Sequence, residues 1–176
     1  ACWQRFVFLR EFILSTEPVH MIDYRLATTV DDFTEAARLF REYAQWLNID
    51  LCFQGFEEEL GKLDQMYGAP AGGLLLCLDT ETGVYIGCVG VRRIDEDTAE
   101  LKRMYLQDAY RGKGIGHSLL HESLALAAAL GYKRIRLDTL NHMTPAMELY
   151  RRAGFYEIPP YYHNPEPGAV YFEKLL

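Results

Sequence analysis

The residues of this chain that most directly indicate chemistry form a glycine-rich turn, RGKGIG, which begins at Arg111. Gly112, Gly114 and Gly116 alternate with other residues, and glycine lets the backbone come close to a ligand so that successive amides converge on it. A helix starting behind the turn adds the partial positive charge of its N-terminus. Arg111 and Lys113 add formal positive charge. The turn therefore suits a pyrophosphate.

The spacing of this turn differs from two well-known phosphate loops. A nucleotide P-loop places Lys and then Ser or Thr after its second glycine, whereas Ile115 follows Gly114 here. A dinucleotide fingerprint runs G-x-G-x-x-G, whereas these glycines run G-x-G-x-G. The remaining pattern, Arg111-x-x-Gly114-x-Gly116 between a strand and a helix, resembles the acetyl-coenzyme A signature of the GNAT family of N-acetyltransferases.

The resemblance to this family extends over residues 21–176, because strands and helices follow in the family's order from the first strand to the motif that ends at Phe155. It implies an α/β fold of the GNAT type, with a mixed central sheet of about six or seven strands, splayed at the fourth strand and flanked by about four helices. It leaves the acceptor open, since this scaffold acetylates antibiotics, polyamines, amino acids, peptide N-termini and lysines.

The resemblance also implies a cofactor, acetyl-coenzyme A, as the acetyl donor, with no metal. The pyrophosphate is expected on the turn, and the pantetheine arm on main-chain groups at the end of the fourth strand. Asn141, after the fifth strand, matches a position that commonly contacts coenzyme A, and capping of a turn is the alternative. The expected cofactor-binding residues are Met104, Tyr105, Leu106, Arg111, Gly112, Lys113, Gly114, Ile115, Gly116 and Asn141.

Two residues are candidates for proton transfer. Tyr150 matches the tyrosine of the family's L-Y-x-x-x-G-F pattern, which often protonates the sulfur of coenzyme A. A phenol with a pKa of about 10 is mostly protonated at neutral pH and can donate; a core tyrosine with a satisfied hydroxyl is the alternative. Glu100 occupies a strand position where several family members carry a glutamate, and is either the base that deprotonates the acceptor or half of an ion pair.

The acceptor pocket is expected to draw on two segments. One is residues 48–55, which are poor formers of regular structure and lie where the family places a lid. The other is a Pro- and aromatic-rich loop near the C-terminus, in which paired rings either surround a ligand or pack the loop. Glutamates at residues 57–59 either meet a cation or form a solvated helix face. The expected acceptor-binding residues are Phe53, Gln54, Tyr161, Tyr162 and Asn164.

The elements that must position these residues alternate between strands and helices. On the fourth strand, a period of two places Glu100, Lys102 and Met104 on one face and Leu101, Arg103 and Tyr105 on the other. Gly87 and Gly90 indicate bulges or a close neighbour in the third strand. Helices are expected after Thr29, over residues 56–63, behind the glycine-rich turn and after Thr144. Strands are expected at residues 22–26, 74–78, 84–93, 99–106, 134–138, 155–157 and 170–175.

The composition predicts one domain. A chain of 176 residues that is 49% hydrophobic buries one sizeable core, over residues 21–176, with residues 1–20 as an extension of uncertain role. The formal net charge of −7 argues against nucleic acid or an anionic membrane as a partner and favours cations as visitors. We expect a monomer or homodimer.

Cysteine spacing predicts the compartment. Cys2, Cys52, Cys77 and Cys88 form no C-x-x-C pair, which is typical of free thiols in a reducing cytoplasm. Residues 1–20 contain no apolar run long enough for a signal peptide or a membrane span. A cytoplasmic protein is therefore expected.

Two histidines are considered as metal ligands. His117 and His121 have the spacing of a zinc-chelating pair, but Ser118 replaces the required Glu and no third ligand is evident. We expect an exposed pair and no metal.

Two functions compete. One is an N-acetyltransferase that moves an acetyl group from acetyl-coenzyme A to a primary amine by direct attack on the thioester. The other is a non-catalytic acyl-coenzyme A-binding module that acts as a sensor or docks a partner. O-acetylation and longer acyl donors stay open, and release of thiol in the presence of amines discriminates the first two.

Overall fold

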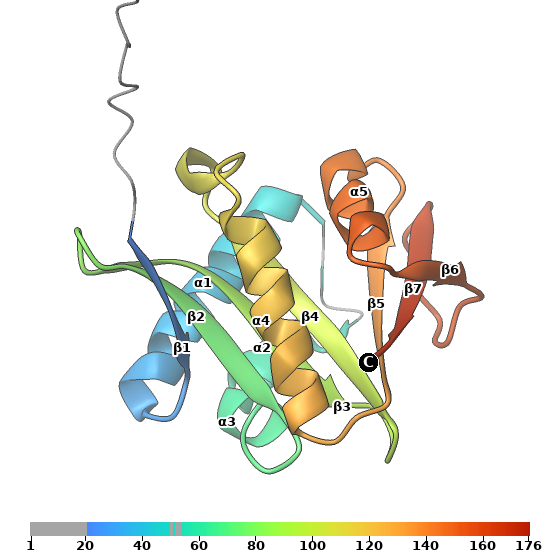
Figure 1. The fold of residues 1–176 in the computed structure, drawn as a ribbon, viewed down its shortest axis with the longest axis horizontal. Coiled ribbons are helices and arrows are strands. Elements are labelled where there is room, and N and C mark those ends of the chain that lie inside the picture. The colour runs from blue at the N-terminus through green and yellow to red at the C-terminus, as the bar shows by residue number, and fades with distance from the viewer. Residues whose placement is uncertain (1–20, 50, 52–53) are drawn as a thin grey trace, which may run out of the picture.

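Seven strands form one mixed sheet in the computed structural model, which describes residues 21–49, 51 and 54–176 (Figure 1). The order in the sheet is β1-β2-β3-β4-β5-β7-β6, and every neighbouring pair is antiparallel except β4 and β5. The predicted mixed sheet of about six or seven strands is thus confirmed. The strands are β1 (Ile22–Leu26), β2 (Gly73–Asp79), β3 (Val84–Arg93), β4 (Thr98–Leu106), β5 (Arg134–Leu140), β6 (Tyr156–Ile158) and β7 (Ala169–Leu175).

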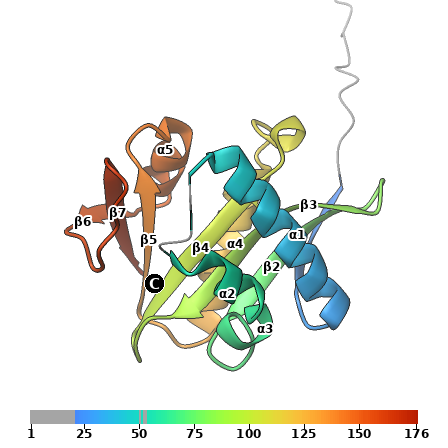
Figure 2. The ribbon, with the colours of Figure 1, turned by 180° about the vertical axis from the view of Figure 1, so that it is seen from behind.

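Helices cover both faces of the sheet (Figures 1 and 2). One face carries α1 (Val30–Leu47), α2 (Phe56–Leu60) and α3 (Leu63–Met66), and the other carries α4 (Ile115–Ala129) and α5 (Thr144–Arg152). Thr29 caps α1 in a reciprocal pair of hydrogen bonds with Asp32. The single helix predicted over residues 56–63 is wrong, because Gly61 ends α2 and Lys62 leaves the helical region with φ −135° before α3 starts.

A bulge in β4 corrects the predicted alternation of its side chains. On β3, Cys88 and Gly90 are two residues apart. Their partners on β4, Tyr105 and Lys102, are three residues apart, so β4 holds one residue more than β3 in this interval. Arg103 provides the irregularity, with φ +55°. Side chains beyond it therefore change face. Glu100, Lys102, Arg103 and Tyr105 face α1–α3, and Leu101 and Met104 face α4.

The parallel strands β4 and β5 diverge, as expected for a sheet splayed at its fourth strand. They pair only from Thr98 to Glu100 on β4, and Glu100 lies opposite Arg136. Beyond this point β5 continues to pair with β7 on its other side. Figure 1 shows the two strands separating toward the end of the sheet where α5 lies.

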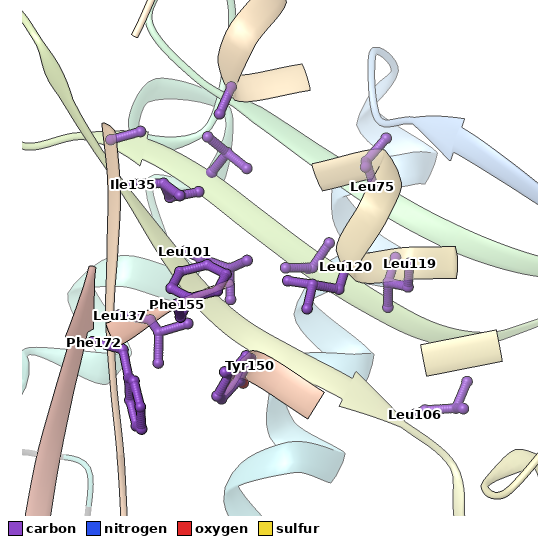
Figure 3. Packing of buried hydrophobic residues seen from close by; sticks show 14 of the residues in the cluster. Leu75, Leu101, Leu106, Leu119, Leu120, Ile135, Leu137, Tyr150, Phe155 and Phe172 are labelled. Atoms are coloured by element: carbon purple, nitrogen blue, oxygen red, sulfur yellow. The ribbon is translucent and has the colours of Figure 1, made fainter. Parts of the chain in front are cut away.

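Two hydrophobic clusters hold the helices on the sheet. On the face of α4 and α5, Leu119 and Leu120 pack toward Leu101, and Tyr150 lies near Phe172 (Figure 3). On the other face, α1 to α3 pack on the sheet around the fully buried Phe40 and Tyr67. A Cβ at Gly90 would lie 2.4 Å from the ring of Tyr67, which confirms the close neighbour predicted for that glycine.

The described residues contain no helix long and apolar enough to span a membrane. Cys77 and Cys88 are buried free thiols. Cys2 and Cys52 lie outside the described residues, as do residues 1–20, so their expected role as an extension stays a prediction.

Candidate functional site

The glycine-rich turn leads from β4 through a short 3₁₀ turn (η2, Asp108–Tyr110) into α4. Gly112 and Gly114 take left-handed conformations with φ +75° and +81°, which explains the choice of glycine there. A Cβ added at either of them or at Gly116 would meet no atom within 4 Å, so the turn borders open space. Gly114 caps α4 without a side-chain hydrogen bond, which leaves amides of its first turn for an anion.

The side chain of Arg111 ties this turn to its neighbours. Its Nε donates to the carbonyl of Leu106 at 2.8 Å, and its guanidinium lies 2.7 Å from the carboxylate of Asp108. The same guanidinium stacks 4.2 Å from the ring centroid of Trp46, at the end of α1. Sequence reasoning missed Trp46, because only the fold brings α1 to the end of β4.

A cavity of about 480 Å³ opens beside the turn, between α1, α4, α5 and the end of β4. Its lining includes seven residues predicted for the cofactor or for proton transfer. Lys113, Gly114 and Ile115 lie in the turn but outside the lining, and Asn141 also lies outside it, beside Gly168. The seven predicted residues that line it are Met104, Tyr105, Leu106, Arg111, Gly112, Gly116 and Tyr150.

Tyr150 reaches this cavity from α5. Its buried ring packs edge-on against Phe155, at 5.7 Å between centroids, and against Phe172 at 6.1 Å. Within the described part of the chain, its hydroxyl makes no hydrogen bond. The alternative, a core tyrosine whose hydroxyl is hydrogen-bonded, is therefore not supported. Burial raises the pKa of Tyr150 well above its ordinary value, with smaller effects from Tyr43 and Asp138. The phenol is therefore protonated at neutral pH.

Glu100 lies away from this cavity and is held on both of its oxygens. Arg92 donates to Oε2 through Nε at 2.7 Å and approaches the same oxygen with a terminal nitrogen at 2.6 Å. The hydroxyl of Tyr161 donates to Oε1 at 2.8 Å. The structure thus contains the ion pair that was the alternative to a base, and the role of Glu100 as a base stays a prediction.

Three of the four predicted acceptor residues that the structure describes cluster at Asp138, where β5 has left β4, and the fourth, Tyr161, bonds Glu100 instead. The hydroxyl of Tyr162 donates to Asp138 at 2.7 Å, and Asn164 donates to the same oxygen at 3.2 Å. Gln54 donates to the hydroxyl of Tyr162 at 3.4 Å. Burial and the charge of Asp138 raise the pKa of Tyr162 well above its ordinary value. Phe53 lies outside the described residues.

Lys102 completes this cluster, and neither it nor Asp138 was predicted as a site residue. Its ammonium, which is almost fully buried, lies 3.3 Å from Asp138 and 4.0 Å from Glu100. It also lies 5.6 Å from the ring centroid of Tyr162. A lysine and an aspartate on neighbouring strands are common at the surface of a sheet, so their sequence positions do not indicate burial. Their burial follows from the divergence of β4 and β5, which only the structure shows.

Two cavities meet at this cluster. A second cavity, of about 640 Å³, lies on the α3 side of the sheet and is lined by Tyr161 and Glu100, among others. A neck of about 50 Å³ shares Asp138 with the first cavity and Lys102 with the second. Two molecules held in the two larger cavities would therefore approach each other at Asp138 and Lys102.

Two other expectations have clear outcomes. Glu57 and Glu58 are exposed, but Glu59 is buried and pairs with Arg103 at 2.6 Å, so Glu59 belongs to neither a solvated face nor a ligand site. His117 and His121 are exposed, as predicted. The described residues contain no group of three or more His, Cys, Asp or Glu side chains that could hold a metal.

Comparisons with known proteins agree with this geometry. The sequence model of the Acetyltransferase (GNAT) family matches residues 31–155. An uncharacterised N-acetyltransferase of Schizosaccharomyces pombe is 38% identical over 148 residues, which cover 84% of this chain and 88% of the relative. An acetyltransferase structure from Streptococcus agalactiae superposes with a TM-score of 0.74 at 22% identity, over 88% of this chain and 98% of that one. The structure of a GNAT family acetyltransferase from Elizabethkingia anophelis with acetyl-CoA bound superposes with a TM-score of 0.60 at 20% identity, over 88% of this chain and 98% of that one.

Proposed function

This chain belongs to the GNAT acetyltransferase family, and from that membership we propose that it is an acetyl-coenzyme A-dependent N-acetyltransferase acting on a primary amine. The observation that carries the proposal is the neck that lies between two cavities at the gap between β4 and β5 and shares lining residues with each. One cavity adjoins the glycine-rich turn, and the other adjoins the loop predicted for the acceptor. A module that only senses acyl-coenzyme A needs the first cavity alone, so the second cavity favours the enzyme over a sensor.

The residues beside the first cavity fit acetyl-coenzyme A. Amides of the turn and of the first turn of α4 would hold its pyrophosphate, because no side chain of the described residues caps that helix. Main-chain groups of Met104, Tyr105 and Leu106 would hold the pantetheine arm, since β5 does not pair with this part of β4. When bound, the thioester supplies the acetyl group.

The side chains around the neck have separate roles in this proposal. The acceptor amine enters from the second cavity and attacks the thioester carbon as a neutral amine. Tyr150 donates the proton that the departing thiolate needs, and its raised pKa keeps that proton in place until charge develops. Asp138, oriented by Lys102 and Tyr162, accepts a hydrogen bond from the amine, aligns its lone pair and takes the proton that the nitrogen loses as the amide forms. Solvent then removes that proton from Asp138 and returns one to Tyr150.

The proposal also places the protein in the cytoplasm. Cys77 and Cys88 are free thiols in the structure, which supports a reducing cytoplasm. Acetyl-coenzyme A and free amines are both available there.

A screen for thiol release with acetyl-coenzyme A and a pool of primary amines tests the activity. Gly116→Glu tests the cofactor site, because Gly116 lines the first cavity on a helical turn with open space around it. The added bulk and negative charge should abolish calorimetric binding of acetyl-coenzyme A. His117→Glu adds the same charge on the same turn at an exposed residue outside the lining and should retain binding. If Gly116→Glu is folded and binds acetyl-coenzyme A as well as His117→Glu does, the turn is excluded as the pyrophosphate site.

A further inference from the structure

The lining of the second cavity is cationic, although the chain as a whole is acidic. Aspartate and glutamate outnumber lysine and arginine by 25 to 18 in the sequence, so an average surface of this protein would carry more carboxylates than cations. Among the described residues, the lining of the second cavity reverses this balance, with Glu100 as its single carboxylate. The cations of the lining are Arg92, Arg93, Lys102 and Arg103.

Carboxylates outside the lining compensate part of this charge. Lys102 pairs with Asp138 at 3.3 Å, and Arg103 pairs with Glu59 at 2.6 Å. Arg92 pairs with Glu100 within the lining. Three of the four cations thus have a carboxylate partner, and the charge of the fourth is left over.

Arg93 is that fourth cation. Among the described residues it forms no ion pair, and its Nε lies 3.3 Å from the main-chain carbonyl oxygen of Asp95. Arg92 and Arg93 line the second cavity but not the neck, whereas Lys102 lines both. Arg93 pairs with Ala99, which faces α4, so its exposed side chain meets the cavity at the rim. The uncompensated charge is therefore at the rim of the cavity, away from the neck.

We propose that the acceptor is an amine that also bears an acidic group, whose anion lies against Arg92 and Arg93 while its amine lies at the neck. This inference rests on the proposed function, which requires the amine at the neck. An amine attacks only in its neutral form, and in that form such an acceptor carries one negative charge. It neutralises the cavity, whereas a neutral lysine side chain leaves the excess charge uncompensated and the remaining ammonium groups of a polyamine add to it. The cations that the net charge of the chain led us to expect as visitors are thus disfavoured at this site.

Matched pairs of amines test the charge of the acceptor. Three amino acids (alanine, leucine and phenylalanine) are compared with their α-amides, and 2-aminoethylphosphonate is compared with ethanolamine. The first arm identifies a carboxylate as the acidic group, and the second identifies a phosphonate. Rates are expressed per neutral amine, because the acidic group raises the pKa of the neighbouring amine. Binding of the same compounds to the coenzyme A-saturated protein is measured by calorimetry.

In at least one arm the acidic amine is expected to exceed its neutral counterpart by about tenfold or more in kcat/KM and in affinity, since a charge-assisted hydrogen bond distinguishes the two. Arg93→Gln, at an exposed residue where the fold tolerates change, is expected to remove most of that ratio. Arg41→Gln is the control: Arg41 is exposed on α1 and lines none of the cavities, so the same loss of net charge there should leave the ratio intact.

The outcomes separate this inference from the proposed function. Absence of acetyl-coenzyme A binding refutes the proposed function, and selective binding of acidic amines would still support the cationic acceptor site. Acetylation of amines with no preference for an acidic group in either arm overturns the inference alone. Equal effects of Arg93→Gln and Arg41→Gln overturn it as well, because the preference would then come from the field of the whole protein. An acid that neither binds nor reacts better than its neutral counterpart overturns it whether or not turnover is seen.

Discussion

Replacing Tyr150 with phenylalanine separates catalysis from stability at the first cavity. The substitution keeps the ring, and with it the packing against Phe155 and Phe172. It removes only the hydroxyl, which has no hydrogen-bond partner among the described residues. A hydroxyl of this kind contributes little to folding, so the free energy of unfolding should change by less than about 0.5 kcal/mol.

The effect on turnover should be much larger. Loss of a general acid lowers the rate of the chemical step by about 10²-fold or more, and each tenfold corresponds to about 1.4 kcal/mol of activation free energy. The expected rise in the barrier is therefore about 2.8 kcal/mol. The Michaelis constant for acetyl-coenzyme A should change little, because the hydroxyl acts on the departing sulfur.

Tyr67→Phe is the matched control, because Tyr67 is a fully buried tyrosine that lines none of the cavities. Its hydroxyl donates to the buried carboxylate of Glu59. Removing that donor should destabilise the fold by about 1–3 kcal/mol and leave turnover unchanged. The two variants should thus show opposite patterns.

Denaturant unfolding gives the stability of both variants, and single-turnover kinetics gives the rate of the chemical step. Near-normal turnover of Tyr150→Phe in a step limited by chemistry would refute the reasoning. A loss of stability as large as that of Tyr67→Phe would show that the hydroxyl is structural.

Two further predictions concern the stability of the fold, and a third concerns cofactor binding. Arg103→Leu should destabilise by about 3–5 kcal/mol in denaturant unfolding, because it leaves the carboxylate of Glu59 buried without its partner; a loss below about 1 kcal/mol would contradict this. Burial acts to raise the pKa of Glu59, but the charge and hydrogen bonds of Arg103 outweigh it, and the native pKa lies below the ordinary value of 4.5. The stabilisation from the ionised Glu59 is thus complete above pH 4.5 and is lost as the pH falls below that value. Glu59→Gln should therefore weaken the dependence of the unfolding midpoint on acid pH, and an unchanged dependence would refute this prediction. Deletion of residues 1–20 should leave acetyl-coenzyme A binding intact in calorimetry, because the family match begins at residue 31, and a folded truncated protein that fails to bind would show otherwise.

The sequence predicts those parts of the site that depend on local chemistry. The glycines at 112 and 114 take conformations that other residues disfavour, so their spacing alone locates the turn and the start of α4. Tyr150 is predicted by a short pattern on one helix. Tyr161 and Tyr162 are predicted by a loop rich in aromatic residues, and their approach to the splayed strands is a consequence of β7 pairing beside β5.

The parts that sequence reasoning misses depend on contacts between distant segments. Arg103 reads as the next residue in a regular alternation, and only pairing with β3 reveals that it occupies a bulge. Its partner Glu59 reads as one of three exposed glutamates, because burial of a charge on a short acidic helix has no local signal. Asp138 and Lys102 are ordinary strand residues until β4 and β5 separate around them.

The divergence of β4 and β5 also bears on aggregation. A strand with unpaired main-chain groups is a template for strands of other molecules, and outer edges of sheets are protected against this by charge, brevity or distortion. Residues 101–106 of β4 pair with β3 on one side, and no described strand pairs with them on the other. This edge lies inside the sheet, flanked by α1, α4 and α5, so a foreign strand would have to displace those helices to reach it. The protein thus offers main-chain hydrogen-bonding groups to a small ligand without exposing them to another chain.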